Sequence, residues 1–437
     1  MSQSLRVGIA GLGTVGASVI RLLDRQSAAL ASRTGRSIKV VAVSARERNR
    51  DRGVDLTGVT WFDDPVALAR SNDIDLFVEL MGGSEGAARE AVQVALQSGK
   101  SVVTANKALL AAHGMELAHI AEEKHVALAF EASVAGGIPI VKTLREGLAG
   151  NQIVRVYGIL NGTCNYILTR MEREGLSFEA CLKEAQRLGY AEADPTFDIG
   201  GFDTAHKLAI LTSLAFGTAV DKDAIHVEGI QSITLADLQA AEELGYRIKL
   251  LGVAQRTPHG IEQRVHPTMV PKSSSIAEVM GVTNAVTIDA DAVKELTLVG
   301  PGAGGDATAS AVVADIADIA KGIRSAPFGL PTASLESASR LPMQRHEGGY
   351  YIRLSVHDRP GAAAAIATRM AERQISLESI MQRQRPARAG ESHEKGVVPV
   401  LLITYATSET AIREALEAVV KDGYIAERPQ VIRIERE

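Results

Sequence analysis

The chain has 437 residues, of which 46% are hydrophobic and 23% are charged, a balance that excludes a wholly disordered or collagen-like protein. Lys and Arg number 47 against 52 Asp and Glu, and the formal net charge of −5 argues against nucleic acid as a partner. No apolar run is long enough for a membrane span, the first residues lack a signal-peptide pattern, and two cysteines are too few for a disulfide framework. We therefore expect a cytoplasmic protein of about three domains.

The first third of the chain alternates short apolar runs with Ala- and Leu-rich stretches of helical periodicity. The apolar runs are continuous, as in strands that are buried on both faces of a parallel sheet. They lie at Leu5–Ala10, Ile38–Val43, Leu76–Leu80, Ser101–Thr104 and Val126–Phe130, with helices expected near 16–30, 65–71, 86–98 and 108–123. This alternation predicts an α/β fold with a Rossmann-type, doubly wound parallel sheet.

The pattern changes after Pro139, which indicates a different kind of domain. Residues 151–300 mix longer helices, at about 174–188 and 203–217, with strands that include Ile153–Leu160, Lys249–Gln255 and Val286–Ala290. This mixture predicts an α+β domain that binds substrate and forms dimers. An Ala-rich helix follows at about 307–321, and turn formers mark 325–346 as a linker.

From Tyr350 onward a compact strand–helix–strand–strand–helix–strand (βαββαβ) pattern begins. We therefore expect a first domain at 1–137 that is completed by the helix at about 305–322. A second domain is expected at 138–304 and a C-terminal one at 347–437.

A glycine-rich turn, Gly11-Leu-Gly13-Thr-Val-Gly16, follows the first predicted strand and opens a helix. Gly11 would make the tight turn, Gly13 would let a pyrophosphate approach the backbone, and Gly16 would let the helix pack on the strand. Free N–H groups at Thr14 and Val15 and the positive end of the helix favour an anion. We predict a dinucleotide site, the alternative being a glycine-rich turn without a ligand.

The end of the second predicted strand indicates which dinucleotide is bound. An acidic residue there would bind the ribose 2′-hydroxyl of NAD, but this chain has Ser44-Ala-Arg46. An Arg that faces a 2′-phosphate contributes roughly 1.5–3 kcal/mol, or about one to two decades of preference for NADP. We predict Arg46 for this contact, with NAD still possible, and interpret the arginines at 48, 50 and 52 as a solvated loop.

Polar segments follow two further predicted strands, and a third lies at 190–207. Thr104 and Lys107 come at the carboxyl end of a parallel strand, where ligands bind, and are expected beside the nicotinamide. Asp203 and Lys207 lie four residues apart on a predicted helix whose face continues through apolar residues. A buried ion pair on such a face points to chemistry, whereas the alternative is an exposed pair worth about 0.3–0.5 kcal/mol.

Taken in order, these segments resemble homoserine dehydrogenase. The resemblance rests on Gly11–Gly16, Val78-Glu-Leu-Met-Gly-Gly83, Thr104-Ala-Asn-Lys107, Glu131-Ala-Ser-Val-Ala-Gly-Gly-Ile-Pro139, Asn161-Gly-Thr-Cys-Asn-Tyr-Ile167 and Gly189–Pro195 with Asp203-Thr-Ala-His-Lys207. It covers about residues 5–325, and the segments near Asn161 and at 190–207 are more specific than the glycine turn.

The resemblance implies a reversible NAD(P)-dependent hydride transfer between L-homoserine and L-aspartate 4-semialdehyde, in threonine, methionine and isoleucine biosynthesis. It implies that Lys207 donates a proton to the aldehyde oxygen, with Lys107 on the other side of that oxygen. Asp203 would orient Lys207 and bind substrate, Glu192 would hold the substrate ammonium, and Asp198 matches another acid of the family. A positioned Lys whose pKa is lowered suits this chemistry.

The resemblance also implies a monovalent cation, such as Na⁺, bound largely by backbone carbonyls of Glu131, Val134, Gly136 and Ile138. A hard cation of this kind prefers oxygen ligands. Gly302, in the cluster Gly300–Gly305, matches a cofactor-facing loop of the family. The alternative for that cluster is a glycine linker that begins a helix.

The C-terminal segment Tyr351–Gly361 resembles the start of an ACT domain. Such domains pair through their sheets and often bind amino acids, so threonine is the effector hypothesis and a dimerisation module without ligand is the alternative. Ala362 and Ala363 stand where larger apolar residues are commoner. A homodimer or homotetramer is expected.

Two other functions stay open at this point. One is an enzyme like aspartate-semialdehyde dehydrogenase, which needs a nucleophilic Cys, whereas Cys164 is interpreted as a buried filler. The other is a non-catalytic sensor of dinucleotide and amino acid, because an ACT-like segment follows a Rossmann-type one. His206 is interpreted as a packing or surface residue.

Overall fold

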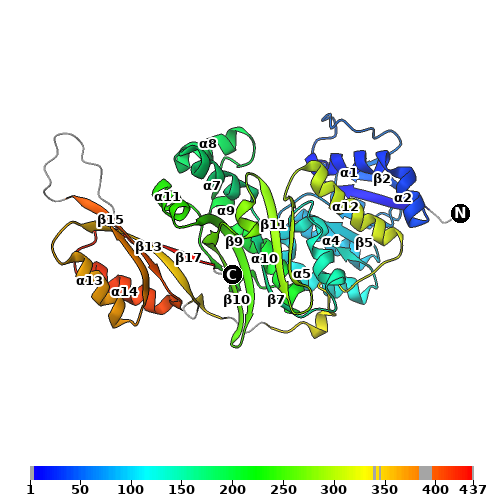
Figure 1. Cartoon of the computed structure of the whole chain (residues 1–437). Coiled ribbons are helices and arrows are strands. Elements are labelled where there is room, and N and C mark those ends of the chain that lie inside the picture. Colours follow the sequence, from blue (N-terminus) through cyan, green and yellow to red (C-terminus); the bar gives the residue numbers. More distant parts are fainter. Residues whose placement is uncertain (1–3, 338–340, 344–345, 383–395, 436–437) are drawn as a thin grey trace.

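The computed structural model describes residues 4–337, 341–343, 346–382 and 396–435 (Figure 1). The chain forms a row of three parts: an N-terminal parallel sheet with its helices, a central curved sheet, and a C-terminal sheet with two helices. No helix in the described part of the chain has the length and apolar character of a membrane span. The predicted fold class, Rossmann-like sheet, α+β part and C-terminal βαββαβ pattern, is confirmed.

The first sheet is wholly parallel, with strand order β3-β2-β1-β4-β5-β6. Its apolar runs are buried on both faces, since Val7 and Ile9 are completely inaccessible. The strands are β1(Leu5–Ala10), β2(Ile38–Ser44), β3(Thr60–Phe62), β4(Leu76–Glu79), β5(Ser101–Thr104) and β6(Leu128–Ala129), and the helices are α1(Thr14–Arg25), α2(Ser27–Thr34), α3(Pro65–Arg70), α4(Ala87–Gln97) and α5(Lys107–Glu123). The single helix expected near 16–30 is wrong, because Gln26 separates α1 from α2.

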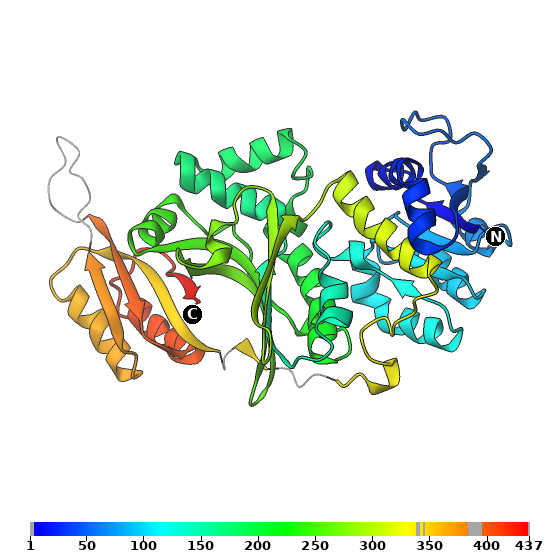
Figure 2. The same ribbon diagram turned by 45° about the vertical axis from the view of Figure 1, so that its right-hand side comes forward.

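Helix α12(Gly305–Ala320) follows the central part in sequence but packs along α1 of the first part, as Figures 1 and 2 both show. Small side chains allow this close approach: a Cβ on Gly305 would lie 2.7 Å from the Ser18 hydroxyl. The turn that precedes α12 is thereby held against the glycine-rich turn of β1.

The central sheet carries the elements β7(Ile153–Ile159), β8(His226–Val227), β9(Tyr246–Thr257), β10(Gly260–Pro271), β11(Thr283–Ala290) and β12(Lys294–Pro301), with helices α6(Ile140–Lys142), α7(Gly162–Glu174), α8(Phe178–Arg187), α9(Thr196–Ile199), α10(Phe202–Phe216) and α11(Leu235–Glu243). The helix expected at 174–188 is wrong at its start. Gly175, with φ 64°, ends α7, and Ser177 caps α8 by accepting from the Ala180 N–H. Short turns are η1(Glu131–Ser133), η2(Thr143–Gly147), η3(Lys222–Ala224), η4(Ser275–Glu278) and η5(Thr332–Ser334).

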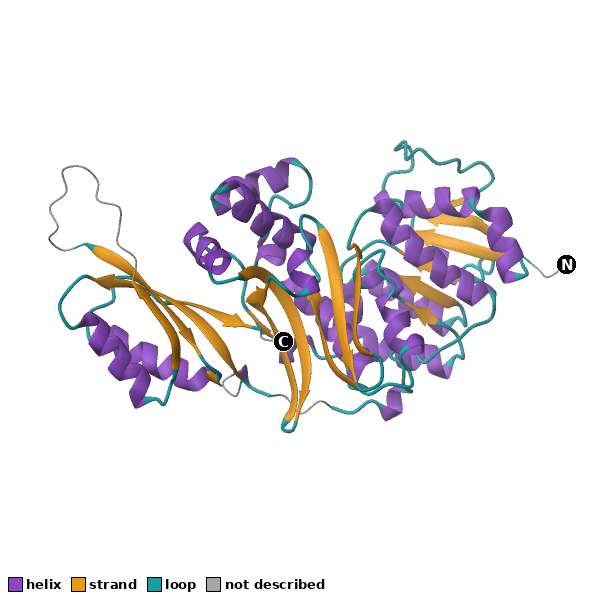
Figure 3. Ribbon diagram, viewed as in Figure 1, coloured by secondary structure: helices purple, strands orange, loops and turns teal. Residues whose placement is uncertain are grey.

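The C-terminal part follows the expected order, with both helices on one face of its sheet (Figure 3). Its elements are β13(Glu347–His357), α13(Ala362–Glu372), β14(Leu377–Gln382), β15(Val397–Thr404), β16(Thr407–Ser408), α14(Glu409–Lys421) and β17(Gln430–Ile434). The predicted linker 325–346 lies partly outside the described residues. Its described part is anchored, because Thr332 donates its N–H and hydroxyl to Glu122.

The sequence did not predict that the central and C-terminal sheets are continuous. Strand β17 pairs in parallel with β10 through Thr268 opposite Arg433 and Met269 opposite Ile434, which produces one eleven-stranded sheet. A buried ion pair reinforces this junction: Arg353 on β13 donates to both carboxylate oxygens of Asp237, at 2.7 and 3.2 Å. Asp237 belongs to α11 and is completely buried.

We expect Arg353→Met to lower the free energy of unfolding of the C-terminal part by about 3–5 kcal/mol, because Asp237 would remain as a buried, uncompensated charge. Thermal and urea denaturation followed by circular dichroism measure this. The control is Arg369→Met, which removes a partly exposed arginine of the same part that pairs with Asp422. Equal destabilisation by the two variants would contradict a structural role for the Arg353–Asp237 pair.

Candidate active site

The glycine-rich turn has the shape that a pyrophosphate requires. Gly11 has φ +100°, and a Cβ there would lie 2.4 Å from the Leu80 carbonyl oxygen. A Cβ on Gly16 would lie 2.1 Å from the Gly11 oxygen, whereas a Cβ on Gly13 would meet nothing within 4 Å. Gly11 therefore allows the turn, Gly16 allows the helix to pack, and Gly13 leaves the backbone open to a ligand. The N-terminus of α1 is exposed at Gly13 and Thr14, as binding of a phosphate requires.

The loop after β2 separates the arginines into two kinds. Arg46 is exposed and makes no hydrogen bond or ion pair within the described residues. Arg52 donates from Nε to the Leu12 carbonyl at 3.1 Å, and its guanidinium lies 5.6 Å from the Trp61 ring centre. The interpretation of Arg52 as solvated is wrong, because it ties this loop to the glycine-rich turn.

The ends of β4 and β5 are held together by one buried carboxylate. Glu79 accepts hydrogen bonds from the Met81 N–H at 2.7 Å, the Gly82 N–H at 3.1 Å and the Thr104 hydroxyl at 2.6 Å. Thr104 is completely buried, and its side chain belongs to this network. The sequence indicated the segment of Glu79 but not this role.

Lys107 is the first residue of α5, and Asn106 fixes that position. The Asn106 side chain caps the helix by accepting from the Leu109 N–H, and it donates to the Gly83 carbonyl at 2.7 Å. The helix start is thereby tied to the end of the neighbouring strand. Asn106 is a site residue that the sequence reasoning missed, although an Asn directly before a helix is an ordinary capping signal.

Two lysines from different parts of the chain meet on one carboxylate. Lys207 Nζ lies 2.7 Å from Asp203 Oδ2, and Lys107 Nζ lies 3.0 Å from Asp203 Oδ1. Lys207 also donates to the Leu160 carbonyl at 2.7 Å, which leaves one of its three N–H groups for another acceptor. The side chain of Asp203 is 6% exposed and that of Lys207 is 11% exposed. The alternative of an exposed surface pair is therefore wrong.

The two amines differ in proton affinity. Burial lowers the pKa of Lys207, and the charge of Lys107 adds to this, so that Asp203 only partly compensates. Burial also opposes the charged form of Lys107, but the attraction and hydrogen bond of Asp203 outweigh it and raise the pKa of Lys107. Burial would raise the pKa of Asp203, yet the two lysine charges hold it well below its usual range.

Asn161 links the acids of the site. Its Nδ2 donates to Asp203 Oδ2 at 2.9 Å and to Asp198 Oδ1 at 2.8 Å, while its Oδ1 caps α7 by accepting from the Cys164 N–H. Burial, together with the Asp203 charge, raises the pKa of Asp198 although the Asn161 hydrogen bond opposes this. Asn161 was part of the resemblance but was not predicted as a site residue.

The remaining predicted residues of this segment lie in different surroundings. Glu192 is exposed outside the hydrogen-bonded cluster, although its charge is near enough to raise the pKa of Lys107. Asp194 accepts from the Thr196 N–H at 3.1 Å, which is the backbone turn expected for an Asp-Pro sequence. His206 packs edge-on against Phe197, with ring centres 5.2 Å apart.

Cys164 is completely buried, and its thiol donates to the Asp198 carbonyl at 3.3 Å. Burial raises the pKa of this thiol well above its ordinary value, and the charges of Asp198 and Asp203 act in the same direction. A thiol in this state is a poor nucleophile. The interpretation of Cys164 as a buried filler is confirmed, and the thioester-forming alternative loses its candidate.

Gly302 lies where the turn before α12 meets the 134–138 loop. A Cβ on Gly136 would lie 2.6 Å from the Gly302 oxygen, and the Gly137 N–H donates to the Pro301 carbonyl. A Cβ on Gly302 itself would lie 2.0 Å from the buried Asn284 side chain. Gly302 therefore has a packing reason to be glycine.

The predicted cation loop offers main-chain rather than side-chain oxygens. The Glu131 carboxylate accepts from the Val141 and Lys142 N–H groups, and burial raises the pKa of Glu131 to about 7. The Ile138 carbonyl accepts from the Ile140 N–H. Within the described residues, no group of three or more His, Cys, Asp or Glu side chains is arranged for a metal. A cation here would depend on backbone carbonyls such as that of Gly136.

Comparisons with known proteins agree over nearly the whole chain. Residues 11–131 match the family model described as homoserine dehydrogenase, NAD binding domain; residues 139–317 match homoserine dehydrogenase, and residues 350–421 match the ACT domain. The homoserine dehydrogenase of Pseudomonas aeruginosa is 45% identical over 95% of each chain, and that of Neisseria gonorrhoeae is 42% identical over 99% of each.

Solved structures show the same similarity. A homoserine dehydrogenase from Thiobacillus denitrificans has a TM-score of 0.92 and 42% identity, and the match covers 99% of this chain and 98% of that one. A hyperthermophilic archaeal homoserine dehydrogenase in complex with NADPH has a TM-score of 0.60 and 29% identity, over 72% of this chain and 97% of that one.

We expect Gly13→Ala and Gly16→Ala to fail in different ways. Gly13→Ala should fold normally but bind the dinucleotide about tenfold or more weakly, because its methyl group occupies the approach to the backbone. Gly16→Ala should lower the free energy of unfolding by about 1–3 kcal/mol, because its Cβ meets a backbone oxygen. Fluorescence titration with NADPH and thermal denaturation separate the effects. Normal cofactor affinity in a folded Gly13→Ala protein would contradict the assignment.

Proposed function

The chain belongs to the homoserine dehydrogenase family, and from that premise we propose which of its residues perform the reaction. The enzyme is an NAD(P)-dependent oxidoreductase that acts on the CH–OH group of L-homoserine and gives L-aspartate 4-semialdehyde. The observation that carries the proposal is the convergence of Lys207 and Lys107 on Asp203. The non-catalytic sensor is thereby set aside.

The proton steps follow from the different environments of the two amines. The bound nicotinamide supplies the hydride in the direction of aldehyde reduction and accepts it in the reverse direction. Lys207, whose pKa is lowered, donates a proton to the aldehyde oxygen and remains fixed by Asp203 and the Leu160 carbonyl. Lys107, whose pKa is raised, keeps its charge and stabilises the negative charge that develops on that oxygen.

The acids around this pair serve substrate recognition in our proposal. An amino acid brings an ammonium group, which pairs with carboxylates. Glu192 is exposed beside Lys107 and is assigned to this group, with Asp198 as a second acid held by Asn161. Asp203 both orients Lys207 and contacts substrate.

NADP is the proposed preferred cofactor, with NAD also accepted. Arg46 is exposed after β2 and has no partner within the described residues, so its guanidinium is available for a 2′-phosphate. The turn residues Gly11 to Gly16 hold the pyrophosphate, and Gly302 lines the opposite side. The archaeal homoserine dehydrogenase described above was solved in complex with NADPH, and this supports the proposal of NADP as the cofactor here.

Several further assignments remain proposals of the same kind. A monovalent cation such as Na⁺ would bind to the backbone carbonyls of Glu131, Val134, Gly136 and Ile138. Threonine would bind to the ACT domain as an effector, and an activity assay with and without threonine tests this. The ACT match supports an amino-acid effector in general. We likewise propose a homodimer or homotetramer and a role in threonine, methionine and isoleucine biosynthesis.

We also propose the functional division 1–137, 138–304 and 347–437, with 325–346 as connection and the helix at about 305–322 completing the first domain. The packing of α12 on α1 supports it. A cytoplasmic location accords with two buried free cysteines.

We expect Lys207→Met to lower kcat for both directions by 10²–10⁴-fold, because the positioned proton donor is lost. In the wild type, aldehyde reduction should fall as pH rises through the lowered pKa of Lys207, since the acid form is required, and homoserine oxidation should rise over the same interval. This change of rate with pH should occur below the ordinary lysine pKa of 10.5, and it should be absent from Lys207→Met. Initial rates against pH with NADPH and NADP measure it.

The matched control is Lys183→Met, because Lys183 is exposed on α8. Lys107→Met should lower kcat while retaining the pH limb of Lys207. Near-normal kcat in both Lys107→Met and Lys207→Met would refute the catalytic assignment.

We expect Arg46→Ala to raise KM for NADP by about 10–100-fold and to leave KM for NAD within about twofold, because only NADP carries the 2′-phosphate. The measurement is homoserine oxidation with each cofactor at saturating homoserine. Arg33→Ala, an exposed arginine on α2, is the control. An equal change in KM for both cofactors would show that Arg46 does not read the phosphate.

A further inference from the structure

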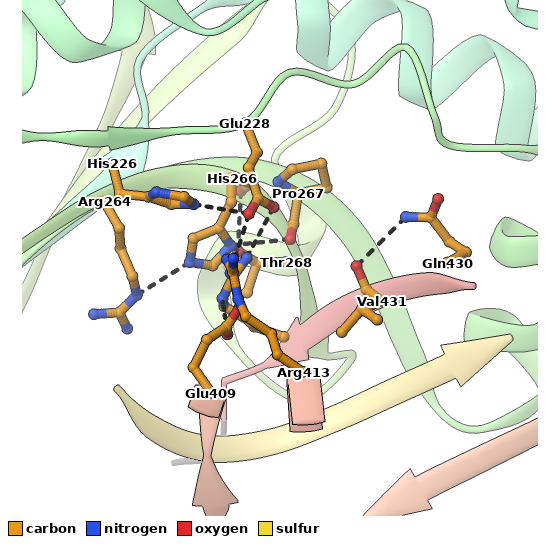
Figure 4. A network of polar contacts seen from close by, with 11 residues as sticks. His226, Glu228, Arg264, His266, Pro267, Thr268, Glu409, Arg413, Gln430 and Val431 are labelled. Carbon is orange, nitrogen blue, oxygen red and sulfur yellow. Dashed lines mark hydrogen bonds and ion pairs between the residues drawn. The ribbon is translucent and has the colours of Figure 1, made fainter. Parts of the chain in front are cut away.

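A cluster of charged side chains lies where β17 of the C-terminal part meets the central sheet. We call it the junction cluster; its members are His226, Glu228, Arg264, His266, Glu409 and Arg433. Figure 4 shows His226 of β8, Glu228 just after it, Arg264 and His266 of β10, and Glu409 at the start of α14 gathered in one place. The reaction described above uses none of these side chains.

Arg433 is the centre of the junction cluster. Its guanidinium donates to both oxygens of Glu228, at 2.9 and 3.1 Å, and also to Glu409 at 2.9 and 3.2 Å. Its side chain is only 4% exposed, so the guanidinium depends on these two carboxylates for compensation. Glu228 belongs to the central part, whereas Glu409 and Arg433 belong to the C-terminal part.

Glu228 is also the first residue of the segment 228–230, which contacts the turn between Asp198 and Asp203. The next residue, Gly229, packs so closely that a Cβ there would lie 2.3 Å from the Ile199 oxygen. The Ile230 N–H donates to that same oxygen at 2.9 Å. Ile199 directly follows Asp198 and lies four residues before Asp203.

The opposite side of this turn is fixed as well. Gly201 has φ +87°. A Cβ on this residue would lie 3.5 Å from the main-chain carbonyl oxygen of Glu228 and 3.0 Å from the Val265 side chain. The Glu228 N–H donates to the Val265 carbonyl at 2.7 Å. The main chain at Glu228 therefore packs against the backbone between Asp198 and Asp203.

We propose that Glu228 is a positioning residue for Asp198 and Asp203, and that Arg433 holds it there from the C-terminal domain. The contact makes the geometry of the substrate-binding acids depend on how β17 is seated against β10. The inference deepens the proposed function and rests on the roles assigned there to Asp198 and Asp203.

The charge on Glu228 favours a fixed position over a mobile one. Burial opposes ionisation, but hydrogen bonds from His226 and Arg433 hold the pKa of Glu228 well below its usual range. The carboxylate therefore stays ionised and bound at neutral pH. His226 Nε2 lies 2.7 Å from Glu228 Oε1, which gives the carboxylate a second partner. Removal of the charge thus weakens the contacts of this side chain with both His226 and Arg433.

The test compares Glu228→Gln with Glu409→Gln. Both substitutions remove one carboxylate from Arg433, but only Glu228 is continuous with the segment against Ile199. Glu228→Gln should lower kcat/KM for L-homoserine by about tenfold, mainly through KM, because misplaced acids bind substrate poorly. KM for NADP should stay within about twofold. Glu409→Gln should leave both values within about twofold.

Thermal denaturation of both variants is measured alongside the kinetics. If Glu228 and Glu409 served stability alone, both variants would melt at lower temperature without a difference between them in KM for L-homoserine. If Glu228→Gln does not fold, Arg433→Lys replaces it, because a lysine keeps the charge but loses the two-pronged hydrogen bonding. Equal kinetic effects of the two Gln variants, or none, would overturn the inference. Retained turnover in Lys207→Met would instead overturn the catalytic assignment on which the inference rests.

Discussion

The site depends on one buried carboxylate that two lysines share. Asp203 is nearly inaccessible, and a charge in that position requires compensation. Lys207 compensates it from the same helix, α10, and Lys107 compensates it from the first turn of α5. Both positive charges reach the carboxylate because α10 of the central part lies against α5 of the first part. The pair also gives the two amines unequal proton affinities, which suits one to proton transfer and the other to charge stabilisation.

The rest of the fold brings these three groups together. Glu79 and Asn106 fix the strand ends that precede Lys107, and Asn161 fixes Asp203 and Asp198 from the start of α7. Helix α12, which follows the second domain in sequence, packs on α1, α2 and β5 of the first. At the far side, Glu228 and Arg433 link the turn at Ile199 to the C-terminal domain.

The elements that the sequence predicts best are those with a single physical cause. The parallel strands are continuous apolar runs, and the glycines at 11 and 16 each answer to a steric requirement of the backbone, while Gly13 leaves the approach to the turn open. Strand β10 escaped prediction because it carries the buried polar residues Glu262, Arg264 and His266. Arg264 pairs with the distant Glu435 and with Glu262, whereas His266 is held by hydrogen bonds with Arg264 and Thr268 of the same strand. Asn161 was missed as a site residue because its partners are 37 and 42 residues away.

The most direct measurement is the titration of the Lys107 and Lys207 amines by NMR in protein labelled at lysine. The account predicts that Lys207 loses its proton at lower pH than Lys107. It also predicts that Asp203→Asn lowers the titration midpoints of both, because the charge that favours their protonated forms is gone. Coincident midpoints for Lys107 and Lys207, unchanged by Asp203→Asn, would contradict it.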